Sequence, residues 1–288
     1  MKNEEIIDKL NTLPERSFPL CNFIDELQRI KTEYVRQDLQ DAAKQIWIYQ
    51  TTVKIHNLYI EAFDLLKNKE HYKGWCKLEE VEILLGFLKN HYQYDQNSFC
   101  LHQIEKTVKN LQVIFPYKLF ASSEMLIQEE KCSICNKVVS IRKPCGHIIG
   151  EIYNGEMCHR IVTKCKLLGI SVVPNPEHKY AVLFLSNNNG KTQDDHYDYH
   201  VIDTLFEKLD NPYDDWDLKV YQYAITKSYY GDIQRNDLSV CGSGKKFKKC
   251  CALNIGKKYP HFEFIFNHLI NSEGVSKYRG ILILYLSP

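Results

Sequence analysis

Apolar side chains recur every three or four residues in three segments of the first half of the chain, which is the spacing of an amphipathic helix. The first segment is long enough for one helix or two, and Pro116 stops the last one. Helices with continuous apolar stripes pack against one another as an antiparallel bundle. We therefore predict a helical domain over residues 1–122. The three segments are residues 23–67, 75–88 and 101–114.

Three carboxylates, Glu79, Glu80 and Glu82, lie along the second of these predicted helices. A functional acidic surface is one interpretation of this group. Because exposed helix faces are usually charged, we prefer the interpretation of a helix face in contact with water.

After the helical part, the pattern changes to short apolar runs separated by Pro, Gly and Asn, which is typical of strands and turns. Residues 168–173 and 180–185 are expected to be strands, residues 201–209 a helix, and residues 281–286 a final strand. Helices that precede a mixed region indicate the α+β class.

The charge of the chain is almost balanced, with 37 Lys and Arg residues against 36 Asp and Glu residues in 288 positions. Composition alone therefore does not indicate a nucleic-acid partner. No apolar run could span a bilayer and no export leader is visible, so we expect no membrane partner and a cytoplasmic location. Because thiols stay reduced there, the 11 cysteines are better explained as metal ligands or buried residues than as disulfides.

A cluster of cysteines lies in the middle of the chain. Cys132 and Cys135 form a C-x-x-C pair, whose tight turn aims two sulfurs at one point, and Cys145 and His147 follow at C-x-H spacing. Cys158 comes next, so more ligands are present than the four positions around a zinc ion require. We prefer the set Cys132, Cys135, Cys145 and His147, with Cys158 as the alternate.

The residues around this cluster predict its local structure. Residues 137–141 look like a short strand, and a helix is expected from Asn154 to Leu167, with Cys158 in its first turn. A strand, a hairpin and a ligand at a helix start resemble a treble-clef or zinc-ribbon unit, which implies a structural zinc ion. His159 and Cys165 are expected to be buried residues outside the ligand set.

A second cysteine cluster lies in residues 235–251. Cys241 precedes a Gly-Ser-Gly turn, and Cys250 and Cys251 follow a group of lysines. Because glycine allows the backbone to double back, the three thiols can approach one another. The positive charges offset part of the negative charge of the thiolates. The lysines are Lys245, Lys246, Lys248 and Lys249.

This segment resembles the SEC-C motif, a short zinc module in the tail of the bacterial protein-translocation ATPase and in many other bacterial proteins. Cys241, Cys250 and Cys251 fall on three of its ligand positions, and Ser239 falls on the remaining one. The resemblance implies a zinc ion held by three thiolates and by water or a distant side chain such as His261. A motif that folds without metal is the alternative. In the ATPase the tail docks a chaperone, which implies a protein-docking role here.

Two functions are compatible with these patterns. We expect a cytoplasmic zinc-binding adaptor that uses structural zinc modules to bind a protein, with nucleic acid as the second partner class. The alternative is a divergent metal-dependent nuclease of a defence or toxin type, with ligands among the Asp and His residues of positions 194–200. That segment also fits a polar loop that caps a helix. The oligomeric state stays open.

The same patterns divide the chain into three expected parts. These are a helical domain over residues 1–122, a zinc-knuckle α+β region over residues 123–232, and a SEC-C-like zinc tail over residues 233–288.

Overall fold

The computed structural model describes residues 3–15, 20–95, 98–186, 193–271, 274–276 and 280–285. It consists of two compact units, Met1–Lys208 and Leu209–Pro288. Helices come first, small antiparallel sheets follow, and the SEC-C-like segment lies in the second unit, so the predicted α+β class is confirmed. The domain boundaries expected after residues 122 and 232 stay a prediction.

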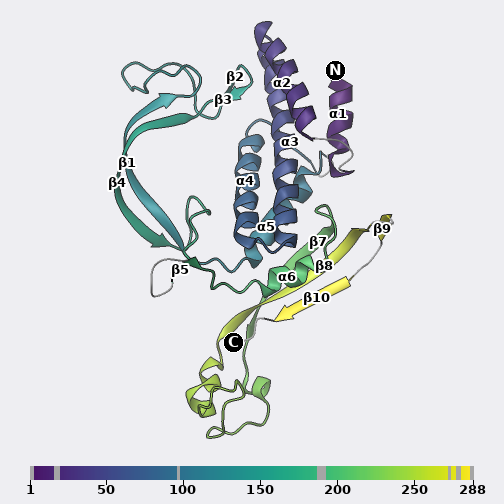
Figure 1. The fold of residues 1–288 in the computed structure, drawn as a ribbon, viewed down its shortest axis with the longest axis vertical. Coiled ribbons are helices and arrows are strands. Elements are labelled where there is room, and N and C mark those ends of the chain that lie inside the picture. The colour runs from purple at the N-terminus through teal and green to yellow at the C-terminus, as the bar shows by residue number, and fades with distance from the viewer. Residues whose placement is uncertain are drawn as a thin grey trace. The chain divides into compact units, whose positions relative to one another are not determined.

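Five α-helices open the first unit (Figure 1). The first apolar segment forms two helices rather than one, because the chain turns at Asp38, which has a φ of 55°. The other two predicted helices form as expected, and Phe115 is already extended before Pro116, as steric conflict with a following proline requires. The helices are α1 (Asn3–Asn11), α2 (Leu20–Arg36), α3 (Gln40–Lys67), α4 (His71–Lys89) and α5 (Leu101–Ile114), with the 3₁₀ turn η1 (Leu13–Glu15) after α1.

The core of the bundle contains the imidazole ring of His56. This side chain is completely buried, and its Nε2 lies 2.9 Å from the backbone oxygen of Phe99. Desolvation by burial lowers the pKa of His56 to about 4. The imidazole is therefore neutral at physiological pH.

The carboxylates of α4 do not all face water, so that part of the sequence interpretation is wrong. Glu79 is only 3% exposed, and its Oε1 accepts the backbone N–H of Lys179 at 3.2 Å. The ammonium group of Lys179 forms ion pairs with both Glu79 and Glu82. Trp75, one turn earlier on α4, donates its Nε1–H to the backbone oxygen of Lys179 at 2.7 Å. These contacts fix a distant loop to the helix.

A long two-stranded ribbon follows the helices in the chain. Strand β1 (Phe120–Cys132) pairs antiparallel with β4 (Arg160–Val173). The register shifts at Glu124/Met125 and again between Ile127 and Glu130, and such bulges bend a ribbon, which is an arc in Figure 1.

The helix predicted from Asn154 to Leu167 is wrong. These residues form the hairpin of β2 (Ile152–Tyr153) and β3 (Glu156–Met157) and then the first half of β4. Their apolar positions also fit a helix, but the β-branched run Ile161-Val162-Thr163 favours a strand once β1 is available as a partner.

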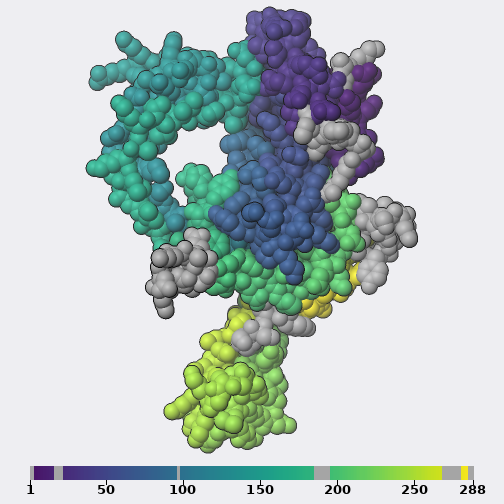
Figure 2. All heavy atoms as spheres, viewed as in Figure 1, coloured from purple at the N-terminus to yellow at the C-terminus, as the bar shows by residue number. Residues whose placement is uncertain are grey.

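The ribbon has no second layer over its middle, where the space-filling view shows open space between it and the helices (Figure 2). Large apolar side chains on both of its strands are exposed to solvent. They include Met125, Leu126, Ile127, Leu167, Leu168, Ile170 and Val172.

The chain returns to the helices after the ribbon. Only a bridge from Val182 to Phe120 and the short strand β5 (Leu185–Ser186) form where a strand was expected over residues 180–185. Strand β6 (Gln193–Asp194) pairs with β5, and the predicted helix forms as α6 (His200–Phe206).

The second unit is built on an antiparallel sheet with strand order β10-β8-β7, and β9 pairs antiparallel with the end of β8. Trp216 and Phe264 are buried on it, with ring centroids 5.9 Å apart. The expected final strand forms as β10. The elements are β7 (Asp215–Ala224), η2 (Lys227–Tyr230), η3 (Phe247–Lys249), η4 (Cys251–Asn254), β8 (Lys258–Asn271), β9 (Gly274–Ser276) and β10 (Gly280–Tyr285).

Burial of His56 predicts a pH-dependent stability of the helical bundle. The pKa of His56 in the folded protein, about 4, lies below the ordinary value of about 6.5. Between these two values the unfolded chain is protonated at His56 and the folded chain is not, so falling pH favours unfolding. The stabilisation is complete above the unfolded pKa, and roughly 2–3 kcal/mol of it is lost by about pH 4.5. Urea unfolding followed by helical circular dichroism measures this loss.

His56→Gln is the matched variant, because its amide can still donate to Phe99 but does not titrate. In this variant the difference in the free energy of unfolding between neutral pH and about pH 4.5 should be smaller by roughly 2–3 kcal/mol. An equal pH dependence in both proteins would contradict the assignment to His56.

Candidate metal centres

The first pair of cysteines lies in a tight turn at the end of β1. Cys132 is the last residue of the strand, and its backbone N–H donates to the oxygen of Lys137 at 3.0 Å. Asn136, with a φ of 56°, donates its N–H back to the oxygen of Cys132 at 2.9 Å. This closed turn directs the thiols of Cys132 and Cys135 toward one point, as the C-x-x-C spacing predicts.

The second pair approaches from the following loop. Gly146 separates Cys145 from His147 and has a φ of 86°, a conformation that side chains with a Cβ rarely adopt. The His147 ring packs edge-on against Tyr153, with centroids 4.7 Å apart. The backbone N–H of Ile148 donates to the Tyr153 hydroxyl at 3.0 Å, so the loop is held beside the β2–β3 hairpin.

The four preferred donors converge. One ligand atom from each of Cys132, Cys135, Cys145 and His147 lies within 4.8 Å of all the others. The Cys132 sulfur is 3.7 Å from His147 Nδ1. A tetrahedral zinc ion with bonds of about 2.3 Å to sulfur and 2.0 Å to nitrogen separates its ligand atoms by roughly 3.5–3.8 Å. The residues therefore fit a metal ion of this kind.

Cys158 also reaches the cluster, so the competition between donors persists in the structure. Its sulfur lies 3.8 Å from that of Cys132, and its side chain is completely buried. The backbone of Cys158 is fixed by hydrogen bonds of 2.8 Å with Glu151 and Gly150. Burial raises the pKa of the Cys158 thiol, whereas the backbone N–H groups of Cys135 and Ile134 lower that of Cys132 to about 6.

Three local expectations around this cluster are wrong. Cys158 lies between β3 and β4 and not in the first turn of a helix. His159 and Cys165 are exposed rather than buried. Cys165 is exposed because it lies on β4, whose side chains are mostly in contact with solvent in this two-stranded ribbon.

The turn of the β2–β3 hairpin attaches the cluster to the helices. Lys31 of α2 is buried and donates to the backbone oxygen of Gly155 at 3.2 Å and to the Glu156 carboxylate at 2.6 Å. Gly155 has a φ of 66°, and a Cβ there would lie 2.5 Å from the Lys31 side chain. A residue with a Cβ is therefore disfavoured at position 155. His91 contacts the preceding loop, with its Nε2 2.7 Å from the backbone oxygen of Gly150.

The second cluster brings together the three thiols of the C-terminal motif. Donor atoms of Cys241, Cys250 and Cys251 lie within 4.8 Å of one another, and the sulfurs of Cys241 and Cys250 are 3.4 Å apart. Hydrogen bonds from the hydroxyls of Ser243 and Ser239 lower the pKa of Cys241 to about 6. The arrangement therefore favours the thiolate form that binds metal.

Ser239 lies at the edge of this thiol group. Its side chain is buried, and its Oγ is 3.6 Å from the Cys241 sulfur and accepts the backbone N–H of Cys251 at 3.4 Å. His261, the distant ligand considered from sequence, lies on β8 with its ring against Tyr221. Within the described residues, no His, Asp or Glu joins the three thiols.

A small apolar group supports the motif. Phe247 is buried together with Ile225, Tyr230 and Cys251, and the rings of Tyr230 and Phe247 are 5.3 Å apart. None of the lysines on either side of Phe247 belongs to this buried group. Lys245, Lys246 and Lys249 are exposed, and Lys248 is half-buried.

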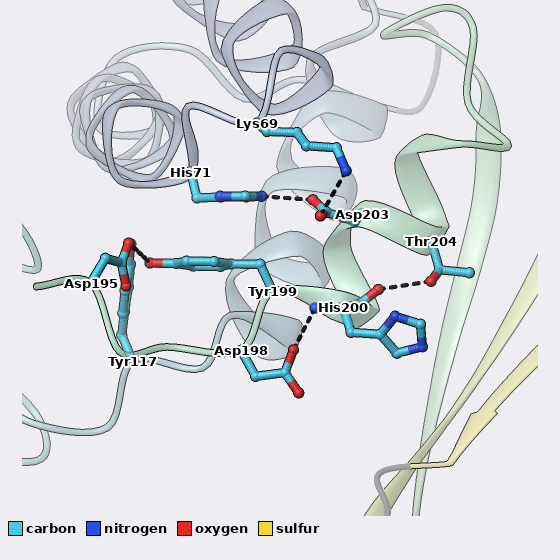
Figure 3. Close-up of polar contacts among 9 residues, drawn as sticks. All are labelled: Lys69, His71, Tyr117, Asp195, Asp198, Tyr199, His200, Asp203 and Thr204. Atoms are coloured by element: carbon cyan, nitrogen blue, oxygen red, sulfur yellow. Dashed lines mark hydrogen bonds and ion pairs between the residues drawn. The ribbon is translucent and has the colours of Figure 1, made fainter.

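The Asp and His residues considered for a nuclease have local structural roles (Figure 3). Asp195 accepts the Tyr199 hydroxyl at 2.7 Å, and Asp198 accepts the backbone N–H of His200 at 2.9 Å, at the start of α6. The His196 ring lies tilted by 32° against the neighbouring Tyr197 ring, with the ring centroids 4.3 Å apart. The side chain of Asp194 lies outside the described ones. Among those described, this segment contributes to no metal-binding group.

One residue near this segment was missed by the sequence interpretation. His71, the first residue of α4, is held by Asp203 of α6 at 2.7 Å and stacks on the Tyr199 ring at 3.9 Å. Lys69 contacts the same carboxylate at 3.2 Å. His71 and Asp203 are more than a hundred residues apart in the sequence, so no local sequence pattern predicts their contact. These contacts join α6 to the bundle.

A comparison with known protein families identifies the C-terminal module. A family model described as the SEC-C motif matches residues 235–253. The match covers the three thiols, the lysines and Phe247 but only a short part of the chain. No curated protein and no solved structure matches the chain. The resemblance drawn from sequence is therefore confirmed for this segment.

The central cluster predicts that Cys135→Ser removes its metal ion and loosens the tip of the ribbon. Metal binding to such sites contributes on the order of 10 kcal/mol, which is also folding free energy. Native mass spectrometry should show one metal ion fewer, and limited proteolysis should cut within residues 133–159 while the helices stay intact. Cys165→Ser is the matched control, because this exposed thiol lies outside the cluster.

The same measurement distinguishes the fourth ligand. With the preferred set, His147→Ala loses the ion and Cys158→Ala keeps it. The opposite result would assign the position to Cys158, and loss of metal in neither variant would contradict both sets.

The position of Ser239 predicts that Ser239→Cys tightens metal binding by the C-terminal motif. A fourth thiolate at this position completes a closed tetrahedral site, whereas a neutral hydroxyl is a poor ligand. Competition with a chromophoric chelator should show at least about a tenfold higher affinity, which corresponds to 1.4 kcal/mol. Ser239→Ala should not show this gain. An unchanged affinity in Ser239→Cys would place the hydroxyl outside the coordination sphere.

Proposed function

We propose that the chain is an interaction protein whose C-terminal motif, ordered by a zinc ion, docks onto an acidic surface of a partner protein. The observation that carries this proposal is the outward position of the lysines around the buried Phe247. We call Lys245, Lys246, Lys248 and Lys249 the lysine turn.

The surroundings of the lysine turn support a docking role. Leu238, Val240 and Leu253 are each more than half exposed in the same motif. Positive charges steer an acidic partner and set orientation, and nearby apolar side chains supply the desolvated contact that holds it. A surface with both properties suits protein recognition better than a uniformly charged one.

Zinc is the metal that the donors favour. Both clusters are rich in thiols, and the central cluster adds an imidazole, which is the donor set of structural zinc sites. Calcium and magnesium prefer oxygen ligands and would not select these residues. In the central cluster protein donors can fill every position, so the role we assign to that ion is structural.

The state of the thiols supports a reducing location. All cysteines whose side chains are described are free. Sites built from thiolates persist where disulfides do not form, which is the condition of the cytoplasm. Of the described helices, not one combines the length and the apolar character needed to cross a membrane.

Docking through the lysine turn predicts that replacing its four lysines by glutamate abolishes partner capture. Repulsion replaces attraction at the acidic surface, and capture by the parent protein should already weaken with rising salt. Photo-crosslinking mass spectrometry, which needs no lysine at the site, should show partner peptides linked to residues 238–253 of the affinity-purified parent and none linked to these residues in the variant.

The control carries four Lys→Glu changes at exposed positions of the first unit, Lys54, Lys118, Lys143 and Lys166. It should retain the partner, and native mass spectrometry should show that both variants keep their metal. If both variants lost the partner equally, the loss would be explained by the change in net charge and not by the lysine turn. Capture of nucleic acid without protein would contradict the proposal.

A further inference from the structure

An open cavity with a volume of about 730 Å³ lies between the end of α4 and α5. Its size is in the range of small-molecule sites. It belongs to neither cysteine cluster and has no part in the proposed docking. Its lining consists of Lys89, Gln93, Tyr94, His102, Glu105, Lys106 and Lys109.

Glu105 organises the positive side chains of this cavity. It is the only acidic residue in the lining, and Lys89 and Lys109 donate to the same carboxylate oxygen, Oε1, at 2.6 and 2.5 Å. The Tyr94 hydroxyl donates to the other oxygen at 2.9 Å. Although burial raises the pKa of Glu105, the hydrogen bonds from Lys109, Lys89 and Tyr94 bring it down to about 2.

The geometry leaves binding capacity for an anion. Because two ammonium groups share one oxygen atom, they lie close together in the absence of any ligand. Each ammonium has three donors and spends one on Glu105, so donors remain for a second acceptor. Lys89 and Lys109 together carry one more positive charge than Glu105 neutralises, although the chain as a whole is nearly neutral.

We propose that this cavity binds a small molecule through a phosphate group. The oxygens of one phosphate can accept hydrogen bonds from neighbouring ammonium groups at once, and such charge-assisted bonds are the strong ones. Glu105 fixes the lysines in advance, so less side-chain entropy is lost on binding than with free surface lysines. Tyr94, over which Lys89 lies at 5.9 Å, provides a wall for the organic part of the ligand.

Inorganic pyrophosphate is the probe, measured by isothermal titration calorimetry on the full chain and by broadening of its ³¹P resonance. The test variant is Lys89→Met/Glu105→Gln/Lys109→Met, which removes both ammonium groups without leaving the half-buried carboxylate unpaired. Pyrophosphate should bind the parent protein, and this binding should weaken as the salt concentration rises. Its affinity for the triple variant should be at least about tenfold lower. Retained affinity in the triple variant would overturn the proposal.

A control separates this site from general charge effects. Lys54→Met/Lys118→Met loses the same number of exposed lysines elsewhere and should bind normally. Equal weakening in this control, or citrate binding as tight as that of pyrophosphate, would overturn the assignment of a phosphate site. Circular dichroism confirms that each variant is folded.

Discussion

The convergence of sulfur donors at the end of β1 is the interaction on which the tip of the β1–β4 ribbon depends. A two-stranded ribbon buries too little apolar surface to define its own tip, and the ribbon here is exposed over most of its length. Its tip is fixed by two contacts that reinforce each other. The thiols join the C-x-x-C turn to the following loops, and Lys31 joins the Asn154-Gly155 turn to α2. Loss of either contact would leave the tip of the ribbon attached at a single point and free to move about it.

The sequence predicts the helices well because their signal is local. Periodicity locates α4 and α5, and it covers most of α2 and all of α3 without deciding whether they form one helix or two. The short helix α1 was not among the predicted segments. Sequence-based prediction fails where the structure of a segment depends on a partner that is distant in the chain. The run from Asn154 to Leu167 has helical spacing, and pairing with β1 decides for a strand. Glu79 looks like a solvated side chain until Lys179, a hundred positions later, covers it.

The candidate sites divide in the same way. The spacing of Cys132, Cys135, Cys145 and His147 is local chemistry, and the sequence was enough to group these residues. It preferred His147 to Cys158 as the fourth ligand. Because both residues reach the Cys132 sulfur in the structure, at 3.7 and 3.8 Å, this preference stays a prediction. The lysines around Glu105 come from two helices and form no motif, so only the fold brings them into one cavity.

The two cysteine clusters differ in what surrounds them, and this difference bears on what each metal ion would do. The central cluster has a surplus of donors and is attached to a helical bundle with its own large core. The C-terminal cluster has three thiols and a hydroxyl, and its apolar support consists of four buried residues. Because so small a core contributes little, we infer that the conformation of the lysine turn depends on a bound metal ion more than the bundle does. Under the proposed function, a fall in available zinc would therefore disturb the proposed docking surface before it disturbs the fold of the helices.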